Sequence, residues 1–498
     1  MNHTNSDSVE QTASLAQRTV WGGLWIFSLR AVNKGLGIIR TIILARFLVP
    51  EDFGLFGIAL LALSTLEVFS QTGFQEALIQ KKGSVAAYLD TAWTISVMRG
   101  LLLFTILFLA APVIAEFFSA TKAVLIIRII AFSTLLTGFR NVGILYLTKD
   151  LDFKKKSFYE FSAASVDLVV SIFLVIMLRN VWALVWGGLA GNLVRLIMSF
   201  IIQPSRPRFK FEREKAAELI RYGRWLLGSG ILIFFVTQGD DIFVGKILGV
   251  TALGFYQMAY LLSNLPATEI THVMSQVTFP AYTKLQDNLP GLKTAYTEVL
   301  QVALLVSFPV AGAIFTLGPD FTHIFLGNHW LPMIPALQVL VVAGFIRSTG
   351  SLTGTLFQAV GRPDLGTKLQ IAKLSILLIV IYPLTIRWGI LGTALAVVIN
   401  GIIVNPFAHL KAIRLVDARV KEFLKYLSIP GFSTLMMVIF LYSIKVRLIA
   451  TQNWFSFIFL LFAGLLIYVF ASFVIDKFLG ADLYALIKRR MISDPKNS

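Results

Sequence analysis

The sequence contains no cysteine, which excludes disulfide bonds, thiolate nucleophiles and cysteine-ligated metal sites. Charge is also scarce, since only 14% of the 498 residues are Asp, Glu, Lys or Arg, whereas soluble domains carry about a quarter. Acidic residues are the scarcest charge: 27 against 44 basic ones, a formal net charge of +17. Apolar residues make up 56% of the chain, and the mean hydropathy is +0.77. This composition excludes an ordinary soluble domain and indicates a membrane protein.

Sequence signatures of enzymes are absent too. No phosphate-binding loop of the type G-x-x-x-x-G-K-[ST] occurs, and the five histidines form no metal-binding pattern. The longest external segment, about 318–334, offers only Asp320, His323 and His329 for catalysis. We therefore expect no enzyme, no metal and no bound cofactor. Nucleic acid is not an expected partner, because there is no compact basic domain with stacking aromatics.

Long apolar runs dominate what is present. A run of about 20 residues is needed to cross the hydrocarbon core, and runs of this length are helices and not barrel strands. The sequence predicts an all-α polytopic membrane protein with about fourteen transmembrane helices. The predicted segments are 16–48, 53–79, 88–117, 124–147, 158–178, 181–202, 217–248, 254–281, 295–317, 334–359, 366–386, 388–410, 423–444 and 454–475.

The basic residues of the connecting segments are distributed very unevenly. Alternate segments, including both termini, hold 24 Lys and Arg residues on one side, and the other side holds only 5: Lys122, Arg179, Arg387, Lys445 and Arg447. Because short positive loops stay in the cytoplasm, both termini are predicted to be cytoplasmic. The positive charge also suits anionic membrane lipids as partners.

The two halves of the chain resemble each other. A shift of 200 residues aligns LARFLVPEDFGLFGIA (44–59) with VGKILGVTALGFYQMA (244–259), so that Arg46 meets Lys246 and Gly54 meets Gly254. With six predicted helices each, the halves would form two six-helix bundles related by a parallel internal repeat, as in transporters with a central cleft. The predicted parts are an N-terminal tail 1–15, a bundle 16–202, a basic linker 203–216, a bundle 217–410, two further helices 423–475 and a C-terminal tail 476–498.

Charges inside the membrane are costly and mark candidate sites. At 100° per residue, Arg30, Asn33, Lys34 and Arg40 lie within an arc of about 120° on the first helix. A cationic stripe of this kind is expected to face a cavity, and snorkelling of the long side chains is the alternative. Arg140 and Arg347 occupy deep positions in the two halves and are expected to line the same cleft.

Few acidic residues lie in the predicted helices. Asp240 falls at the repeat position of Arg40, which suggests a bridge between the halves that breaks as the cleft opens. Pairing with embedded arginines is favoured for Asp167 and Glu67, whereas proton or cation coupling is equally open for Asp240, Asp241 and Glu269. Glu67, Asp240, Asp241 and Glu269 are therefore the candidates for ion coupling or gating, and a proton or cation gradient is the candidate driving force.

Several motifs resemble one known family. LARFLVPEDFGLFGIA and TKDLDFKKKSFYE in the first half, and FPAYTKLQDN and GFIRSTGSLTGTLFQAVGRPD in the second, resemble Wzx-type oligosaccharide flippases of the colanic-acid kind, within the multidrug/oligosaccharidyl-lipid/polysaccharide exporter superfamily. The resemblance covers about residues 15 to 475. It implies a fold of two six-helix bundles plus two helices in the bacterial inner membrane.

The resemblance implies translocation of an undecaprenyl-diphosphate-linked oligosaccharide to the periplasmic leaflet, for surface polysaccharide biosynthesis. Arg30, Lys34, Arg40, Arg140 and Arg347 would then bind the anionic headgroup during alternating access. The polymerase and glycosyltransferase machinery would be protein partners. The alternatives are a lipid II or other anion transporter, a membrane glycosyltransferase or polymerase using Glu51 and Asp52, and a cation-coupled drug antiporter.

Overall fold

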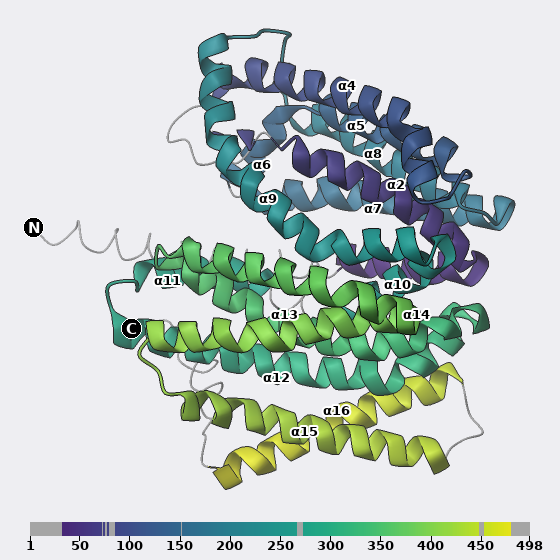
Figure 1. Cartoon of the computed structure of the whole chain (residues 1–498). Coiled ribbons are helices and arrows are strands. Elements are labelled where there is room, and N and C mark those ends of the chain that lie inside the picture. The colour runs from purple at the N-terminus through teal and green to yellow at the C-terminus, as the bar shows by residue number, and fades with distance from the viewer. Residues whose placement is uncertain are drawn as a thin grey trace, which may run out of the picture. The chain divides into compact units, whose positions relative to one another are not determined.

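The structure is a computed structural model that describes residues 32–71, 73–74, 77–78, 85–150, 152–265, 272–447 and 453–479. Within these ranges every regular element is a helix (Figure 1). A helix over 32–47 has no label in the figure. The labelled helices are α2 (Pro50–Phe69), α4 (Ala86–Phe117), α5 (Ala123–Gly138), α6 (Leu145–Lys149), α7 (Phe153–Leu178), α8 (Trp182–Ile202), α9 (Arg213–Ile247), α10 (Val250–Ser263), α11 (His272–Lys284), α12 (Leu289–Phe321), α13 (Ile334–Ala359), α14 (Pro363–Leu415), α15 (Val420–Arg447) and α16 (Trp454–Leu479).

Most of these helices suit a bilayer. Ten are long and apolar enough to cross it, and the bent pair Ala123–Gly138 and Val142–Lys149 would make an eleventh. The all-helical multi-pass prediction is thereby confirmed. The number fourteen stays a prediction, because parts of the predicted segments 16–48 and 254–281 lie outside the described residues.

Helix α14 covers two of the predicted segments, 366–386 and 388–410. Its backbone leaves the helical region at Gly389, where φ is +59° and ψ is −138°. A positive φ of this size favours glycine, which has no Cβ to clash. Ile381 and Ala396 meet in one apolar cluster, and Thr385 bonds Thr393 through their hydroxyls at 2.8 Å. The chain therefore folds back on itself at Gly389, so α14 contains two helices.

The described chain divides into two compact units. Unit 1 comprises residues up to Phe234 together with Gly249–Thr251, and unit 2 comprises Phe235–Leu248 and the chain from Ala252 onward. The division falls inside α9. In unit 1 the predicted linker is fixed to α4, because the backbone N–H of Lys210 donates to the Thr94 hydroxyl at 3.1 Å and that of Arg208 donates to Asp90 at 2.9 Å.

Small residues allow close helix packing in unit 1. A Cβ on Gly100 of α4 would lie 3.0 Å from the Cα of Gly138 on α5, and the Thr134 hydroxyl donates to the Gly100 carbonyl at 3.1 Å. Close approach through small residues is a common way to join helices in membranes. This crossing holds α4 against α5 beside the pocket described below.

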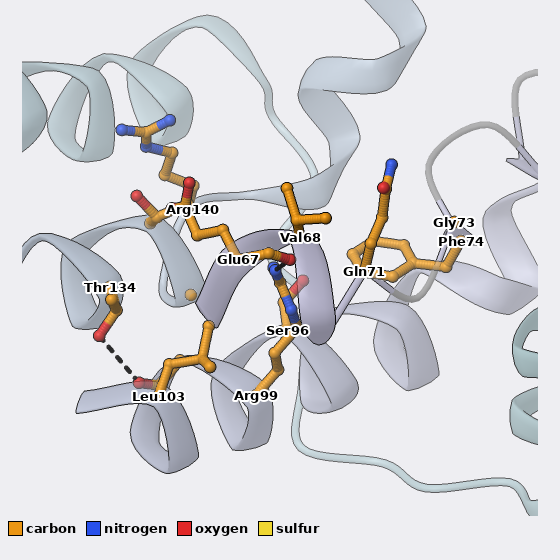
Figure 2. Close-up of a pocket in the computed structure, with 13 residues that line it drawn as sticks. Glu67, Val68, Gln71, Gly73, Phe74, Ser96, Arg99, Leu103, Thr134 and Arg140 are labelled. Atoms are coloured by element: carbon orange, nitrogen blue, oxygen red, sulfur yellow. Dashed lines mark hydrogen bonds between the residues drawn. The ribbon is translucent and has the colours of Figure 1, made fainter. Parts of the chain in front are cut away.

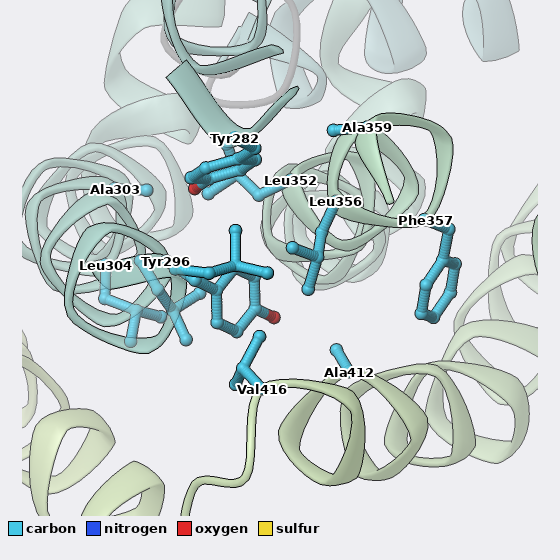
Figure 3. Packing of buried hydrophobic residues seen from close by; sticks show 12 residues of the cluster. Tyr282, Tyr296, Ala303, Leu304, Leu352, Leu356, Phe357, Ala359, Ala412 and Val416 are labelled. Carbon is cyan, nitrogen blue, oxygen red and sulfur yellow. The ribbon is translucent and has the colours of Figure 1, made fainter. Parts of the chain in front are cut away.

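Unit 2 is built around α12, α13 and α14. Tyr296, Leu352, Leu356 and Val416 belong to one buried apolar cluster, whose packing is visible in Figure 3. Helix α15 packs on α12, where a Cβ on Gly312 would lie 2.5 Å from Thr434 Cγ2. Lys445 of α15 also forms an ion pair with Asp320 of α12. Helix α16 also contacts α12, because the Tyr468 hydroxyl donates to the Leu305 carbonyl at 2.7 Å. The two helices outside the predicted repeat thus pack within unit 2.

Candidate substrate site among the embedded charges

Unit 1 contains a pocket of about 440 Å³ between α2, α4 and α5 (Figure 2). We call it the arginine pocket. Its polar wall is made by Glu67, Gln71, Ser96, Arg99, Thr134, Thr137 and Arg140. The α4–α5 crossing forms another part of the wall, because Gly100 and Gly138 also line the pocket. The pocket therefore combines two arginines with one carboxylate.

Arg99 binds the end of α2. Its Nε donates to the Ser70 carbonyl at 2.9 Å and to the Ser70 hydroxyl at 3.0 Å, and one Nη donates to the Glu67 carbonyl at 2.9 Å. The last carbonyl groups of a helix have no partner within the helix and carry partial negative charge, so a cation is stabilised there. These acceptors fix the guanidinium at the pocket wall without neutralising its full charge.

Arg140 is held by a neutral partner as well. Its Nη donates to the Asn192 amide oxygen of α8 at 2.8 Å. Its Nε is buried and has no hydrogen-bond partner within the described part of the chain. Arg195 of α8 shares the Asn192 oxygen at 3.3 Å and forms an ion pair with Glu160 at 3.2 Å. Arg140 is thus a fixed, incompletely bonded cation in the membrane region.

Arg40 differs from Arg99 and Arg140, because a carboxylate neutralises it. Its Nε lies 3.0 Å from Asp167 Oδ1 of α7 and donates to the Ser171 hydroxyl at 3.0 Å, and one Nη donates to the Leu184 carbonyl at 3.3 Å. The favoured pairing of Asp167 with an embedded arginine is confirmed. A Cβ on Gly187 of α8 would lie 1.8 Å from Ser171 Oγ. Close packing of α7 and α8 therefore brings these groups together.

The other predicted positions of the first helix are less informative. Lys34 is half-buried on the helix over 32–47. Arg30 lies outside the described residues, as does Glu269 of the second half. The proposed cationic stripe therefore stays a prediction.

In unit 2, Arg347 of α13 is held by neutral groups. It donates to the Tyr260 hydroxyl and, at 3.0 Å, to the Asn264 amide oxygen, and its guanidinium carbon lies 4.8 Å from the Tyr260 ring centre. Among the described residues neither Arg140 nor Arg347 forms an ion pair with a carboxylate. Both arginines instead bond an asparagine amide.

Two adjacent carboxylates lie buried on α9 in unit 2. Asp240 and Asp241 are only 2% and 4% exposed. The Tyr256 hydroxyl donates to Asp240 Oδ2 at 2.7 Å, whereas Oδ1 of each aspartate has no hydrogen-bond partner in the part of the chain that the structure describes. A buried carboxylate with an unsatisfied oxygen carries a large desolvation cost.

The structure thus places Glu67 and Arg140 in one pocket, whereas Arg40 forms a separate ion pair with Asp167. Arg99 is not among the candidates that the sequence selected. Its position more than three turns into an apolar helix could have marked it as a candidate. Its partners on α2 could not be predicted from the sequence. No cluster that could hold a metal ion occurs among the described residues.

Comparison with known proteins identifies the family. Residues 43–335 match the family described as "Polysaccharide biosynthesis protein". The chain belongs to this family. It is 23% identical over 442 residues to the lipopolysaccharide biosynthesis protein WzxC of Escherichia coli (strain K12), covering 87% of this chain and 89% of that protein. It is 26% identical over 301 residues to the teichuronic acid biosynthesis protein TuaB of Bacillus subtilis (strain 168), covering 60% of this chain and 62% of that protein.

The fold has relatives among solved structures. The lipid II flippase MurJ in an inward closed conformation superimposes with a TM-score of 0.73 at 16% identity, covering 92% of this chain and 99% of that one. The resemblance to polysaccharide flippases is thereby confirmed at the level of family and fold. This polysaccharide biosynthesis protein is a multi-pass membrane protein.

Proposed function

We propose that this protein is a flippase that moves an undecaprenyl-diphosphate-linked oligosaccharide from the cytoplasmic to the periplasmic leaflet, for surface polysaccharide biosynthesis. Its family, its similarity to a lipopolysaccharide and a teichuronic acid biosynthesis protein, and its flippase-like fold support this proposal. The observation that carries it is the arginine pocket, in which Arg99 and Arg140 hydrogen-bond neutral atoms and share only one lining carboxylate, that of Glu67, so the pocket has an excess of positive charge.

A diphosphate is the anion that such a pocket suits. A guanidinium presents several N–H donors in a planar fork that matches phosphate oxygens, and hydrogen bonds to a charged group contribute about 1.5–3 kcal/mol each. Among the described residues, the buried Nε of Arg140 has no hydrogen-bond partner and Arg99 bonds only carbonyl and hydroxyl oxygens. Arg347 is the corresponding candidate in unit 2, whereas Arg30, Lys34 and Arg40 remain predicted contributors.

The proposed topology follows the charge of the loops. Both termini are placed in the cytoplasm and the chain in the bacterial inner membrane, with fourteen helices in two six-helix bundles plus α15 and α16. The two bundles, 16–202 and 217–410, would alternate access to a central cleft. In this arrangement the arginine pocket, at the end of α2 and α5, lies toward the cytoplasmic side.

Asp240 and Asp241 are proposed to couple transport to an ion gradient. Two adjacent buried carboxylates repel each other when both are ionised, and a proton or a cation relieves this repulsion. The unsatisfied Oδ1 atoms are the acceptors for it. Glu67 and Glu269 remain further coupling or gating candidates.

A glycosyltransferase or polymerase is the second class that the sequence left open. The carboxylates of Glu51 and Asp52 are engaged in structural contacts, with Lys122 at 3.0 Å and with the backbone N–H groups of Val49 and Val181 at 3.2 and 3.0 Å. These contacts favour a structural role for the pair. Translocation needs no covalent step, and the glycosyltransferases and polymerase would act before and after it.

The test is leaflet-resolved transport in proteoliposomes. Wild-type protein should move an undecaprenyl-diphosphate oligosaccharide between leaflets without lengthening its glycan, and should not move a cationic drug. Lipid II serves as the test for the alternative anionic substrate. Absence of any oligosaccharide movement by correctly inserted protein, with and without a proton gradient, would refute the proposed function.

A further inference from the structure

Unit 1 contains a second pocket, of about 530 Å³, at the other end of α2 and α5. We call it the tryptophan pocket. Its polar and aromatic wall consists of Glu51, Asp52, Thr121, Lys122, Arg128 and Trp182. Its volume falls in the range typical of small-molecule sites. Neither the proposed diphosphate site nor the proposed coupling site uses it.

Three helix starts form this pocket. Helix α2 begins at Pro50, α5 at Ala123 and α8 at Trp182, and lining residues come from each of these starts. Along α2, Leu55 of this pocket and Glu67 of the arginine pocket are separated by twelve residues, or about 18 Å at the helical rise. The two pockets are therefore separate sites at opposite ends of one unit.

The charges of the tryptophan pocket balance each other. Glu51 forms an ion pair with Lys122 at 3.0 Å. Asp52 accepts the backbone N–H groups of Val49 and Val181, which precede α2 and α8. The positive ends of these two helices thus already have their anion. With Arg128 the wall holds two acids and two bases, unlike the arginine pocket with its two arginines and one acid.

Donors, acceptors and an aromatic surface remain available. Among the contacts of the described residues, the Arg128 Nε donates to the Phe108 carbonyl at 3.4 Å and the guanidinium carbon lies 5.0 Å from the centre of the Phe108 ring, so the Nη groups remain as donors. The ion pair of Glu51 and Lys122 is exposed, at 45% and 74%, so each group can bond further. Trp182, which lines the pocket, is only partly buried, so part of this large aromatic residue is accessible.

We propose that the tryptophan pocket binds a sugar residue of the transported glycan. A sugar hydroxyl both donates and accepts hydrogen bonds, so it suits a wall with carboxylate acceptors beside ammonium and guanidinium donors. The C–H face of the ring packs on an indole, which offers a flat apolar surface with a polar edge. This inference rests on the proposed function, and it assigns the diphosphate and the glycan to different ends of unit 1.

A second diphosphate site is the less suitable interpretation. Added phosphate would meet the carboxylates of Glu51 and Asp52, which already bind Lys122 and the N–H groups at the starts of α2 and α8. In the arginine pocket, by contrast, the two guanidinium groups bond neutral atoms. The balanced charges of the tryptophan pocket therefore suit a neutral sugar, whereas the excess positive charge of the arginine pocket suits an anion.

The proposal can be tested by saturation-transfer difference NMR on the full chain in lipid nanodiscs. The probes are glucose, galactose, N-acetylglucosamine and glucuronate, with inorganic pyrophosphate as the competitor. We expect at least one sugar to bind wild type, and Trp182→Ala to weaken its binding about tenfold or more, which corresponds to about 1.4 kcal/mol. Pyrophosphate should not displace it.

Two further variants keep the test independent of folding defects. Trp388→Ala is the matched control, because Trp388 of α14 is 46% exposed and does not line the pocket. Trp186 is left unchanged, because its ring centre lies 6.4 Å from that of Trp182. The double variant Glu51→Gln, Lys122→Gln changes only exposed side chains and should also weaken sugar binding. Its retention of full sugar binding, together with full binding by Trp182→Ala, would overturn the proposal.

Transport distinguishes this inference from the proposed function. If wild type moves the lipid-linked oligosaccharide but binds no sugar, the sugar site is refuted and the flippase stands. If wild type binds a sugar in a Trp182-dependent way but moves no oligosaccharide, the pocket assignment is supported and the flippase proposal fails. Displacement of the sugar by pyrophosphate would identify an anion site and overturn the assignment.

Discussion

The ion pair between Arg40 and Asp167 gives the most quantitative prediction. The change is Arg40→Gln, which removes the charge of a partly buried group but keeps a side chain, shorter than arginine, that can still form hydrogen bonds. The two side chains are 17% and 26% exposed, and among the partners that the structure describes Asp167 would keep only the hydroxyl of Ser171. Breaking a buried pair from one side costs about 3–5 kcal/mol. Because both side chains remain partly exposed, we expect Arg40→Gln to lower the free energy of unfolding by about 3 kcal/mol.

The double variant Arg40→Gln, Asp167→Asn isolates the cause. Removing both charges leaves no uncompensated carboxylate, so the double variant should lose only about 1 kcal/mol. The two single losses together should exceed this double loss by at least about 2 kcal/mol, which is the minimum coupling between the two positions. The assay is unfolding by SDS titration in mixed micelles, with the free energy of unfolding compared among wild type, both single variants and the double variant. Strictly additive effects, with a coupling below about 0.5 kcal/mol, would refute the reasoning.

Three further outcomes follow from other contacts. Gly392→Ala should destabilise the protein by about 3 kcal/mol, because the added Cβ would lie 1.9 Å from a backbone carbonyl across the α14 turn. Gly366→Ala, which has open space around it, should be tolerated. SDS titration compares the two variants. Asp152→Ala should cost about 1 kcal/mol, because Asp152 accepts the Lys155 N–H at the start of α7. This hydrogen bond lowers the pKa of Asp152. The difference in free energy of unfolding between wild type and Asp152→Ala should therefore be complete above about pH 4 and vanish as pH falls through the folded-state pKa. Unfolding measured over a pH series checks this. Arg140→Gln should weaken pyrophosphate binding about tenfold or more by calorimetry, and unchanged affinity would contradict the anion site.

Much of the fold was accessible from the sequence. Helix formation follows from apolar length, because backbone polar groups in lipid must be satisfied within the segment. Even the turn inside α14 was predicted, since the sequence contains two separate spanning segments, 366–386 and 388–410, divided at Arg387. The bend between α5 and α6 was not predicted, because the apolar residues on both sides of it add up to one segment of spanning length, 124–147. The break lies at Asn141, whose side chain accepts the N–H of Gly143.

The charges of the site were predictable one by one but not as pairs. A costly charge in an apolar run can be recognised in isolation, which selected Arg140, Arg347 and Asp240. The partner of Arg40 lies on α7, far along the chain, and depends on how closely α7 approaches α8 at Gly187. Sequence spacing carries no information on such contacts between helices.

Arg99 illustrates the same limit. Its partners are backbone carbonyls at the end of α2, and every residue type has a carbonyl, so no side-chain pattern could reveal the contact. What the sequence could show was the charge itself. Its role in the arginine pocket emerges only from the packing of α2 against α4 and α5.

The most direct test of the account is leaflet-resolved transport by the double variant Arg99→Gln, Arg140→Gln. Its control is Arg46→Gln, Arg179→Gln, which removes the same charge from two exposed arginines that do not line the arginine pocket. With insertion verified for all proteins, the account predicts that the first variant loses at least about a hundredfold in transport of an undecaprenyl-diphosphate oligosaccharide, whereas the control stays near wild type. Equal transport by the two double variants would contradict the claim that the arginine pocket binds the diphosphate.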